Sequence, residues 1–240
     1  MHYFDSDKKL FALIPARKNS KRLPNKNLLP LGKKLLIDYS LKIAAECEAI
    51  SFAVCASDSD KILEHSKKFI DSLSILKPFH FIKLPGKLTT DDAILMPVVR
   101  YILNRDKVKD LDIDGVVLLQ PTSPFRKQED LYNAINLFVK NQKDVFSVER
   151  LGNTLDKLFV EGKNESPQKI CRNDEQISQF GTPVYNQNGS IYVVGQNRIY
   201  SSDIWVDENC LFYKMPHERS IDIDTEFDLI MANAILKYSL

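Results

Sequence analysis

The chain has 240 residues, of which 44% are hydrophobic and 27% are charged, and its 33 basic and 32 acidic side chains leave a net charge of +1. This composition supplies enough apolar residues for a core and excludes disorder over most of the chain. The balanced charge argues against nucleic acid as a partner, and no apolar run reaches the ~20 residues that a membrane span needs.

The N-terminal residues and the cysteines indicate a cytoplasmic protein. The first nine residues, MHYFDSDKK, are too polar for the apolar core of a signal peptide. The four cysteines, Cys47, Cys55, Cys171 and Cys210, show no CxxC spacing. Cys47 and Cys55 lie in apolar stretches, so we expect them to be reduced core residues of a cytoplasmic protein.

Short apolar runs alternate with segments of helical periodicity through the first 140 residues. The runs predict strands at 10–15, 51–56, 79–84 and 115–120, and the periodic segments predict helices at 35–47, 61–69, 93–103 and 129–139. Repeated alternation of this kind is typical of βαβ units. The sequence therefore predicts an α/β fold with a mainly parallel sheet that is covered by helices on both faces.

The pattern changes after residue 143. A strand is predicted at 144–150, whereas residues 151–187 are polar, with glycine, asparagine and proline scattered among them. A structureless stretch of this length is unusual inside a compact domain, so we expect a lobe or an oligomer contact there. Strand character returns at 190–194, and an extended segment at 221–224 precedes a helix from 225 to 238.

The segment that follows the first strand is strongly basic. Residues 16–27 read ARKNSKRLPNKN and hold five cations, with Asn19, Ser20 and Asn27 as further hydrogen-bonding groups. Ligands of open parallel sheets bind beyond the carboxyl ends of the strands, and cations at that edge suit a triphosphate. The segment matches neither a Walker loop nor a dinucleotide fingerprint, and a solvated basic loop is the alternative.

Two further segments carry polar side chains after predicted strands. Residues 120–126 read QPTSPFR and place Gln120 and Thr122 where a polar ligand such as a sugar could bind, although the hydroxyls could instead only cap a turn. Asp222 and Asp224 are separated by a single residue, Ile223, in an extended segment, so their side chains point to one face. Close carboxylates repel unless a cation lies between them, and Mg²⁺ would satisfy both while meeting the phosphates of a nucleotide. The alternative is that Asp224 or Thr225 caps the following helix and Asp222 is merely exposed.

The order of these segments predicts a nucleotidyltransferase, in which cations and Mg²⁺ hold a nucleoside triphosphate while an acceptor oxygen attacks its α-phosphorus. At the same residues the sequence resembles the CMP-N-acetylneuraminate synthetases (acylneuraminate cytidylyltransferases). The matching motifs are IPAR at 14–17 with SK at 20–21 and KN at 26–27, LLQPTSPFR at 118–126, NGSIYV at 188–193 and IDIDTEFDL at 221–229. They follow the family's order and span about residues 10–235.

The resemblance implies a fold, a reaction and an assembly. The fold would be one three-layer Rossmann-like nucleotidyltransferase domain over residues 1–240, with about residues 145–187 inserted as a dimerisation lobe of a homodimer. The C2 hydroxyl of a nine-carbon 2-keto-3-deoxy sugar acid (sialic, legionaminic or pseudaminic) would attack CTP and release pyrophosphate. Use of another nucleotide or of a sugar phosphate is an alternative, and a non-catalytic nucleotide-sugar binding module is a further one.

The resemblance also implies roles for individual residues. CTP would be held by Arg17, Ser20, Lys21, Lys26 and Asn27, and the sugar acid by Gln120, Thr122, Asn188 and Tyr192. Asp222 and Asp224 would bind Mg²⁺. The catalytic residues would be Lys26, Arg17, Lys21 and Asp222, with Lys26 as the cation nearest the α-phosphate.

Three positions depart from the family's pattern. Asn19 stands where the family has a glycine, and because asparagine adopts positive φ more readily than most residues, we expect a glycine-like turn there. Leu84 replaces an arginine that lies near the base, and Leu95 replaces a serine. The two leucines favour the alternative of another base.

Overall fold

A computed structural model of the chain describes residues 7–90, 94–106, 108–152, 158–161, 166–170 and 183–238. The strands of its central sheet are β1 (Leu10–Pro15), β4 (Phe52–Ser57), β5 (Phe79–Lys83), β6 (Gly115–Leu118), β7 (Val145–Arg150), β10 (Tyr185–Gly195) and β11 (Leu211–Met215). They lie in the order β11-β7-β10-β6-β1-β4-β5. Neighbours are parallel except that β10 runs antiparallel to β6 and β7, so the predicted mainly parallel sheet is confirmed.

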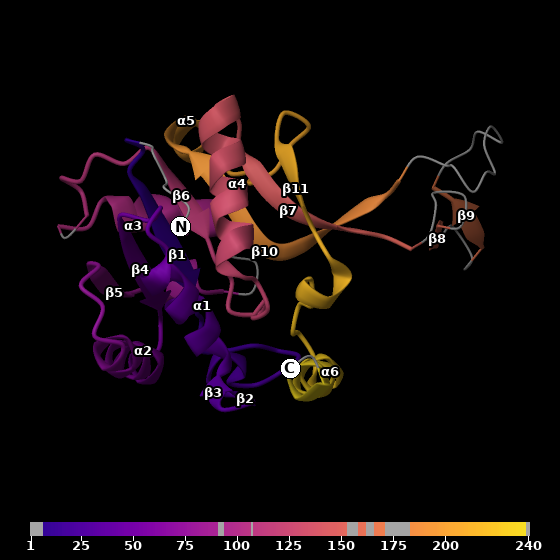
Figure 1. Cartoon of the computed structure of the whole chain (residues 1–240), viewed down its shortest axis with the longest axis horizontal. Helices are drawn as coiled ribbons and strands as arrows, with labels where there is room; N and C mark the ends of the chain where they lie inside the picture. The colour runs from indigo at the N-terminus through magenta and orange to yellow at the C-terminus, as the bar shows by residue number, and fades with distance from the viewer. Residues whose placement is uncertain are drawn as a thin grey trace.

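Helices cover both faces of this sheet, as predicted (Figure 1). They are α1 (Leu36–Glu46), α2 (Asp60–Ser72), α3 (Leu95–Leu103), α4 (Gln128–Asn141), α5 (Gln196–Ser201) and α6 (Glu226–Tyr238). Leu10, Ala12 and Ile14 of β1 pack with α1, α2 and α4, whereas Phe11 and Leu13 pack with α3 and α5. Both sets are fully buried, which explains why β1 is a continuous apolar run rather than an alternating one. Within the described ranges, no helix has the length and apolarity to cross a bilayer.

Several elements of the structure were not predicted from the sequence. These are β11, the six-residue helix α5, and a hairpin of two short strands, β2 (Pro30–Leu31) and β3 (Lys34–Leu35). None of these segments shows a continuous buried apolar run like those of β1, β4 and β6. The predicted helix start at Ala93 lies outside the described residues. Cys47 and Cys55 are buried and free, as expected, whereas Cys171 is not described.

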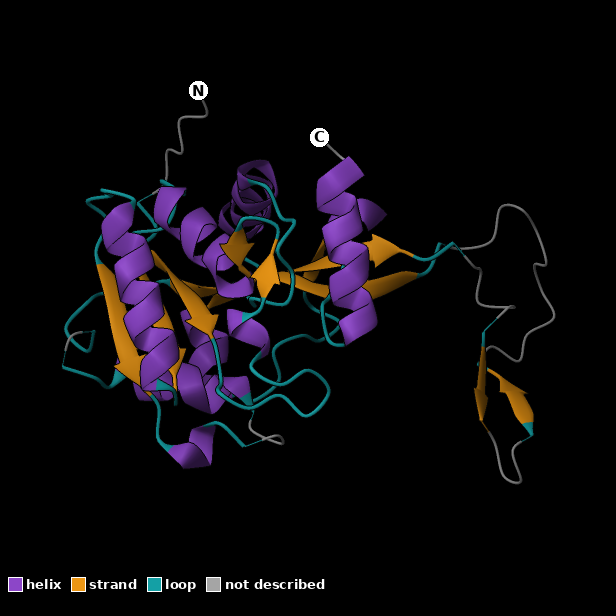
Figure 2. Ribbon diagram, turned by 90° about the horizontal axis from the view of Figure 1, so that it is seen from below, coloured by secondary structure: helices purple, strands orange, loops and turns teal. Residues whose placement is uncertain are grey.

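The predicted lobe at 145–187 contains two kinds of structure among its described residues. β7 and the start of β10 belong to the central sheet, whereas β8 (Phe159–Glu161) and β9 (Pro167–Lys169) form a separate antiparallel pair. This small sheet stands away from the rest of the molecule in both views (Figure 1 and Figure 2). Three large apolar side chains in and beside this sheet are exposed, those of Phe159, Val160 and Ile170.

α6 joins the C-terminal part of the chain to the first third. It packs on the β2–β3 hairpin, where Leu31 and Ala232 are buried in one apolar cluster. Gly32, in the turn of the hairpin, has a φ of 58° and donates its amide to Asn233 (3.1 Å). The positive φ favours glycine here, and a Cβ would lie 3.0 Å from the end of the Leu236 side chain, which would have to shift slightly.

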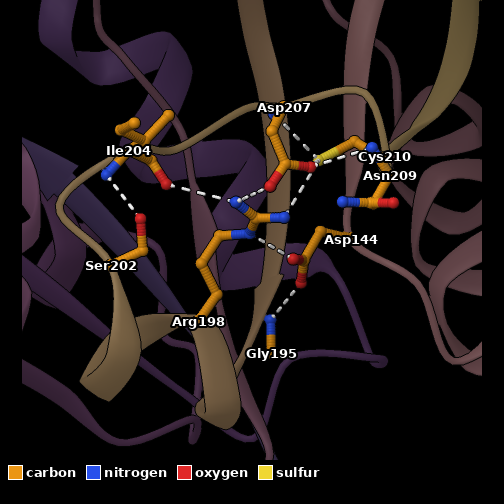
Figure 3. A network of polar contacts seen from close by, with 8 residues as sticks. All are labelled: Asp144, Gly195, Arg198, Ser202, Ile204, Asp207, Asn209 and Cys210. Carbon is orange, nitrogen blue, oxygen red and sulfur yellow. Dashed lines mark hydrogen bonds and ion pairs between the residues drawn. The ribbon is translucent and has the colours of Figure 1, made fainter.

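A charge network around Arg198 of α5 fixes the loop that leads into β11 (Figure 3). Its guanidinium pairs with Asp144 and with Asp207 (2.8 Å), and Asp144 also accepts the Gly195 amide (2.8 Å). Only 12% of the Arg198 side chain and 16% of the Asp144 side chain are exposed, so solvent screens this pair less than an ordinary surface pair. The network holds β11 at its place beside β7.

The buried carboxylate of Asp130 anchors the segment that precedes α6. It accepts hydrogen bonds from Tyr213 of β11 (2.9 Å), from the Arg219 guanidinium (2.7 and 3.0 Å) and from the Lys127 amide (2.8 Å). Arg219 ends a short 3-10 helix, η5 (His217–Arg219), directly before the acidic segment at 220–225. α4 therefore fixes where that segment begins.

Replacing Asp130 should destabilise the fold far more than replacing its neighbour Glu129. Asp130→Ala leaves Arg219, Tyr213 and an amide without their buried acceptor, and we expect a loss of about 3 kcal/mol. Glu129→Ala removes an exposed carboxylate from the same helical turn and should cost less than about 1 kcal/mol. Urea unfolding measures both values, and similar losses would contradict the anchoring role.

Candidate active site

A pocket of about 340 Å³ lies where the loops after β1, β5 and β6 meet, at the carboxyl edge of the parallel strands. An adjoining pocket of about 330 Å³ shares five lining residues with it. Among the residues predicted from the sequence, the two pockets are lined by Arg17, Ser20, Lys21, Lys26, Asn27, Gln120, Thr122, Asp222 and Asp224. Basic loop, polar turn and acidic pair thus surround one space, at the edge where open parallel sheets bind ligands.

Side chains from outside the loop fix the backbone of the basic segment at 16–27. Asp58, which follows β4, accepts the Lys18 amide (2.7 Å), and the Asn27 side chain donates to the Arg17 carbonyl (2.9 Å). Asn27 is 7% exposed, so its amide closes the loop on itself as well as lining the pocket. These bonds fix the backbone of the loop, whereas the side chains of Arg17, Lys18, Lys21 and Arg22 are exposed.

The expected glycine-like turn at Asn19 is wrong. Asn25 is the residue of this loop with a left-handed backbone (φ 54°), and it directly precedes the short 3-10 helix η1 (Lys26–Leu28). The turn therefore lies just before Lys26 and sets the direction in which that lysine leaves the backbone. Asparagine tolerates this conformation at Asn25 for the reason that suggested it at Asn19.

The turn at 120–126 is held from below by the buried guanidinium of Arg126. This group donates to the carbonyls of Ser123 (2.9 Å), Ser190 (2.6 Å) and Gln120, and to the Ser40 hydroxyl (2.9 Å). Burial lowers the pKa of Arg126 to about 9, against the opposing effect of nearby carboxylates, so it remains charged at neutral pH. Arg126 belongs to the motif at 118–126, but its role could not be predicted from the sequence, because the groups that accept its hydrogen bonds lie up to 86 residues away.

The acidic segment is aligned directly on this turn. The Ile223 amide donates to the Thr122 carbonyl (2.8 Å), which places Asp222 and Asp224 on either side of that bond and beside the pocket. Gly189 passes close behind with a φ of 69°, and a Cβ there would lie 3.8 Å from the Asp222 carboxylate. A larger residue at position 189 would therefore be strained and would also narrow the space around Asp222.

The cap predicted as an alternative exists, and Thr225, one of the two residues predicted for it, forms it together with Asp228. The Thr225 hydroxyl accepts the Asp228 amide (3.3 Å), while the Asp228 carboxylate accepts the amides of Thr225 (2.8 Å) and Asp224 (3.0 Å). Thr225 and Asp228 thus cap α6 reciprocally. This arrangement leaves the carboxylates of Asp222 and Asp224 directed to the pocket.

The Asp224 carboxylate is paired with two cations of the basic loop. Lys26 contacts Oδ1 (2.7 Å) and Arg22 contacts Oδ2. The Lys26 side chain is only 11% exposed, whereas that of Arg22 is 67% exposed. Arg22 lines both pockets. It is one of the five cations of the basic segment, but no role was predicted for it from the sequence.

Asn188 and Tyr192 do not line either pocket. Asn188 is buried, accepts the Ser147 hydroxyl (2.6 Å) and donates to the Ser220 hydroxyl (2.9 Å), so it joins β7 and β10 to the start of the acidic segment. Tyr192 is 8% exposed and packs against Trp205, with ring centroids 6.0 Å apart. Both lie behind the pocket wall, where they can position residues that contact a ligand.

One wall of the larger pocket is apolar. It is formed by Leu84, which follows β5, by Leu88 of the short 3-10 helix η2 (Gly86–Leu88), and by Leu95 and Val98 of α3. Thr89 and Thr90, which lie between Leu88 and Leu95 in the sequence, are the polar residues that line the pocket next to this wall. The Thr90 carbonyl accepts a hydrogen bond from Arg17 (3.0 Å). The two leucines that depart from the family's pattern are therefore both wall residues of this pocket.

The acidic pair fits a hard dication. Asp222 and Asp224 offer carboxylate oxygens beside a cation-lined pocket, and Asp224 is close enough to raise the pKa of Asp222. No cluster of three or more metal-binding side chains occurs in the part of the chain that the structure describes. A two-carboxylate set of this kind is what Mg²⁺ uses when phosphates and water complete its shell.

A family model described as cytidylyltransferase matches residues 11–230. The chain belongs to the cytidylyltransferase family. The resemblance noted in the motifs is thereby confirmed, and the protein is a nucleotidyltransferase.

Several cytidylyltransferases are similar over the whole chain. CMP-N,N'-diacetyllegionaminic acid synthase of Legionella pneumophila is 30% identical over 95% of this chain and 97% of its own length. Pseudaminic acid cytidylyltransferase of Campylobacter jejuni is 25% identical with the same coverage, 95% and 97%. N-acylneuraminate cytidylyltransferase of Escherichia coli is 27% identical over 95% of this chain, which spans about half (52%) of that protein.

Solved structures confirm the predicted Rossmann-like cytidylyltransferase fold. CMP:2-keto-3-deoxy-manno-octonic acid synthetase complexed with CTP superimposes with a TM-score of 0.67 at 15% identity, covering 97% of this chain and 100% of that one. 4-Diphosphocytidyl-2C-methyl-D-erythritol synthase from Anaerococcus prevotii gives 0.67 at 17% identity, with 96% of each chain covered. At such identities the similarity is one of fold.

The carboxylates of Asp222 and Asp228 should affect stability with opposite signs. Although Asp222 is exposed at the pocket, the protein atoms around it withdraw water and raise its pKa, and Asp224 raises it further. Ionised Asp222 therefore destabilises the fold, from about pH 3.8 upward and fully above the raised pKa. Asp222→Asn should raise the melting temperature at pH 7, and the gain should shrink toward pH 4.

Asp228 is the matched control. Partial burial opposes its ionisation, but the bonds from Thr225 and the Asp224 amide outweigh that effect and lower its pKa. Its stabilising contribution is present above about pH 3.8 and is lost as pH falls through the lowered pKa, so Asp228→Ala should cost about 1 kcal/mol at pH 7. Thermal unfolding from pH 4 to pH 8 compares the two variants, and a loss of stability in both at pH 7 would contradict the assignment.

Proposed function

We propose that the protein transfers the cytidylyl group of CTP to the C2 hydroxyl of a nonulosonic acid, with release of pyrophosphate. The observation that carries this proposal is the shared pocket, in which the basic loop, the Gln120–Thr122 turn and both carboxylates face one another. In the reaction a new bond forms between the sugar oxygen and the α-phosphorus, the bond from that phosphorus to pyrophosphate breaks, and the hydroxyl proton is released.

The basic loop is the proposed triphosphate site. Arg17, Ser20, Lys21, Lys26 and Asn27 would hold the nucleotide, since all of them line the adjoining pocket. The apolar wall at Leu84 and Leu95 would pack on the base. Charged groups fixed in a partly enclosed pocket attract phosphates more strongly than groups in bulk water, because screening is weaker there.

Lys26 is the proposed catalytic cation. Its side chain is mostly buried and lies between the nucleotide loop and the acidic pair, where it contacts Asp224. A cation held in this way needs little reorganisation when charge develops on the α-phosphate. Asp222 and Asp224 would hold Mg²⁺, which supplies positive charge to the phosphate oxygens and favours ionisation of a hydroxyl bound to it.

The sugar acid would bind at Gln120 and Thr122. Both line the pocket, and Thr122 also fixes the acidic segment through its carbonyl. Asn188 and Tyr192 would act from behind by positioning the acidic segment and the pocket floor. The class of acid is supported by relatives of this chain whose names specify legionaminic, pseudaminic and acylneuraminic acids.

We also propose that the protein is a homodimer that uses the lobe within residues 145–187. The exposed apolar residues near β8 and β9 support this assignment, because monomers rarely leave such groups together on their surface.

Pyrophosphate release tests the reaction. The assay combines CTP, UTP, ATP or GTP with N-acetylneuraminate, legionaminate or pseudaminate in the presence of Mg²⁺. We expect release with CTP and one of the three acids. Release with another nucleotide would mean that Leu84 and Leu95 have changed the choice of base, and no release from the folded protein would contradict the proposed reaction for these acids.

Lys26→Ala should separate catalysis from binding. We expect kcat to fall by about 100-fold or more, while the Kd for CTP rises by less than about 10-fold, because the charge acts chiefly in the transition state. Lys18→Ala removes the same charge from the same loop, but its side chain lines a different pocket beside Asp58 and Asp60. Lys18→Ala should retain the wild-type kcat and the wild-type Kd for CTP. If Lys26→Ala instead lowers kcat and the affinity for CTP by equal factors, Lys26 contributes only to binding of the ground state.

A further inference from the structure

Both oxygens of the Asp224 carboxylate are occupied by cations from the basic loop. Lys26 holds Oδ1 and Arg22 holds Oδ2. A dication that takes Asp224 as a ligand must compete with these pairs. Asp224 therefore has two possible kinds of partner, the side chains of its own loop and a metal ion.

The two cations differ in how easily they can leave. Lys26 begins η1 and is 11% exposed, so it is held by its surroundings. Arg22 lies between the two fixed points of the loop, Lys18 and Asn27, and is 67% exposed. An exposed ion pair adds little stability, because water solvates both partners when they separate. Arg22 is the partner that a metal ion would displace.

Arg22 remains inside the site when it leaves Asp224. Its side chain lines both the larger pocket and the adjoining one, in which it stands among Arg17, Lys21 and Lys26. A planar guanidinium binds phosphate oxygens in a bidentate manner, more specifically than an ammonium group does. A triphosphate in this pocket would thus offer Arg22 a new negatively charged partner in place of the carboxylate that it loses.

We propose that Arg22 is a nucleotide-binding residue that exchanges Asp224 for a phosphate, and that this exchange couples the binding of the dication to that of the triphosphate. The proposal rests on the proposed function in that the triphosphate occupies the basic loop. The dication frees Arg22 for the phosphates, and the phosphates draw Arg22 from Asp224. Each ligand then binds more tightly when the other is present, and by the same factor.

Mn²⁺ binding to the full chain tests the exchange without turnover. Electron paramagnetic resonance gives the Kd for Mn²⁺ with and without CTP, in the absence of any sugar acid; Mn²⁺ shares the oxygen-ligand preference of Mg²⁺. The variants are Arg22→Ala and, as a control for charge, Lys18→Ala, which removes one cation from the same loop but from a different pocket.

Arg22→Ala should bind Mn²⁺ alone about 2- to 5-fold more tightly than Lys18→Ala does, because the competitor for Asp224 is gone. The factor by which CTP strengthens Mn²⁺ binding should fall in Arg22→Ala by a similar amount and stay unchanged in Lys18→Ala. What remains of that factor reflects direct contact between the ion and the phosphates.

A background variant makes the test specific to Asp224. In Asp224→Asn, the further change Arg22→Ala should affect Mn²⁺ affinity no more than Lys18→Ala does. Equal behaviour of Arg22→Ala and Lys18→Ala in the Asp224 protein would overturn the exchange, and so would an Arg22 effect that persists without Asp224. These readings need no turnover, so they stay distinct from a failure of pyrophosphate release in the wild type.

Discussion

The geometry of the site depends on how the buried charge of Arg126 is satisfied. A buried guanidinium without partners is strongly unfavourable, so the carbonyls and the hydroxyl that accept from it are held in place by the same requirement. Because these acceptors come from the turn after β6, from β10 and from α1, one side chain joins three parts of the fold at the pocket floor. The turn then fixes the acidic segment through the bond between Thr122 and Ile223. The positions of the two pocket carboxylates thus follow from a residue that does not itself line the pocket.

Three carboxylates within seven residues, Asp222, Asp224 and Asp228, have different environments and hence different roles. Asp228 receives backbone and hydroxyl donors and is stabilised as an anion, which makes it a helix cap. Asp224 receives cations from the basic loop. Asp222 has weaker interactions with hydrogen-bond donors and cations than Asp228 and Asp224 have. Burial by the surrounding protein and repulsion by Asp224 therefore disfavour its ionisation. A positive ion near Asp222 would relieve this repulsion, so the carboxylate that is least favourable for folding is also the one best prepared for a dication.

Much of this arrangement could be predicted from the sequence, and what could not depended on contacts between distant residues. β1, β4 and β6 were predictable because burial on both faces leaves continuous apolar runs, and the segments that line the two pockets were predictable from their place after strands. β11 was not, since it alternates weakly and is held at the sheet edge by Asp130 and by the network around Arg198. The cap of α6 was predicted as one of two alternatives for the DID segment. In the structure Thr225 and Asp228 form the cap, while Asp222 and Asp224 line the pocket, where the proposed metal site lies.

The proposed nucleotide site presents two kinds of surface. The phosphate side is lined by cations and carboxylates, whose attraction is strong but indifferent to the base. The opposite wall of Leu84, Leu88, Leu95 and Val98 can pack on any base, because leucine and valine side chains make no hydrogen bonds. Large discrimination between ligands requires polar groups that are left unpaired by the wrong one. In the described part of this wall such groups are offered by the backbone and by Thr89 and Thr90, where Arg17 already binds the Thr90 carbonyl. If the base of the nucleotide packs on this wall as proposed, we expect Thr89 and Thr90 to contribute to the choice of base and Arg17 to influence it through the Thr90 carbonyl.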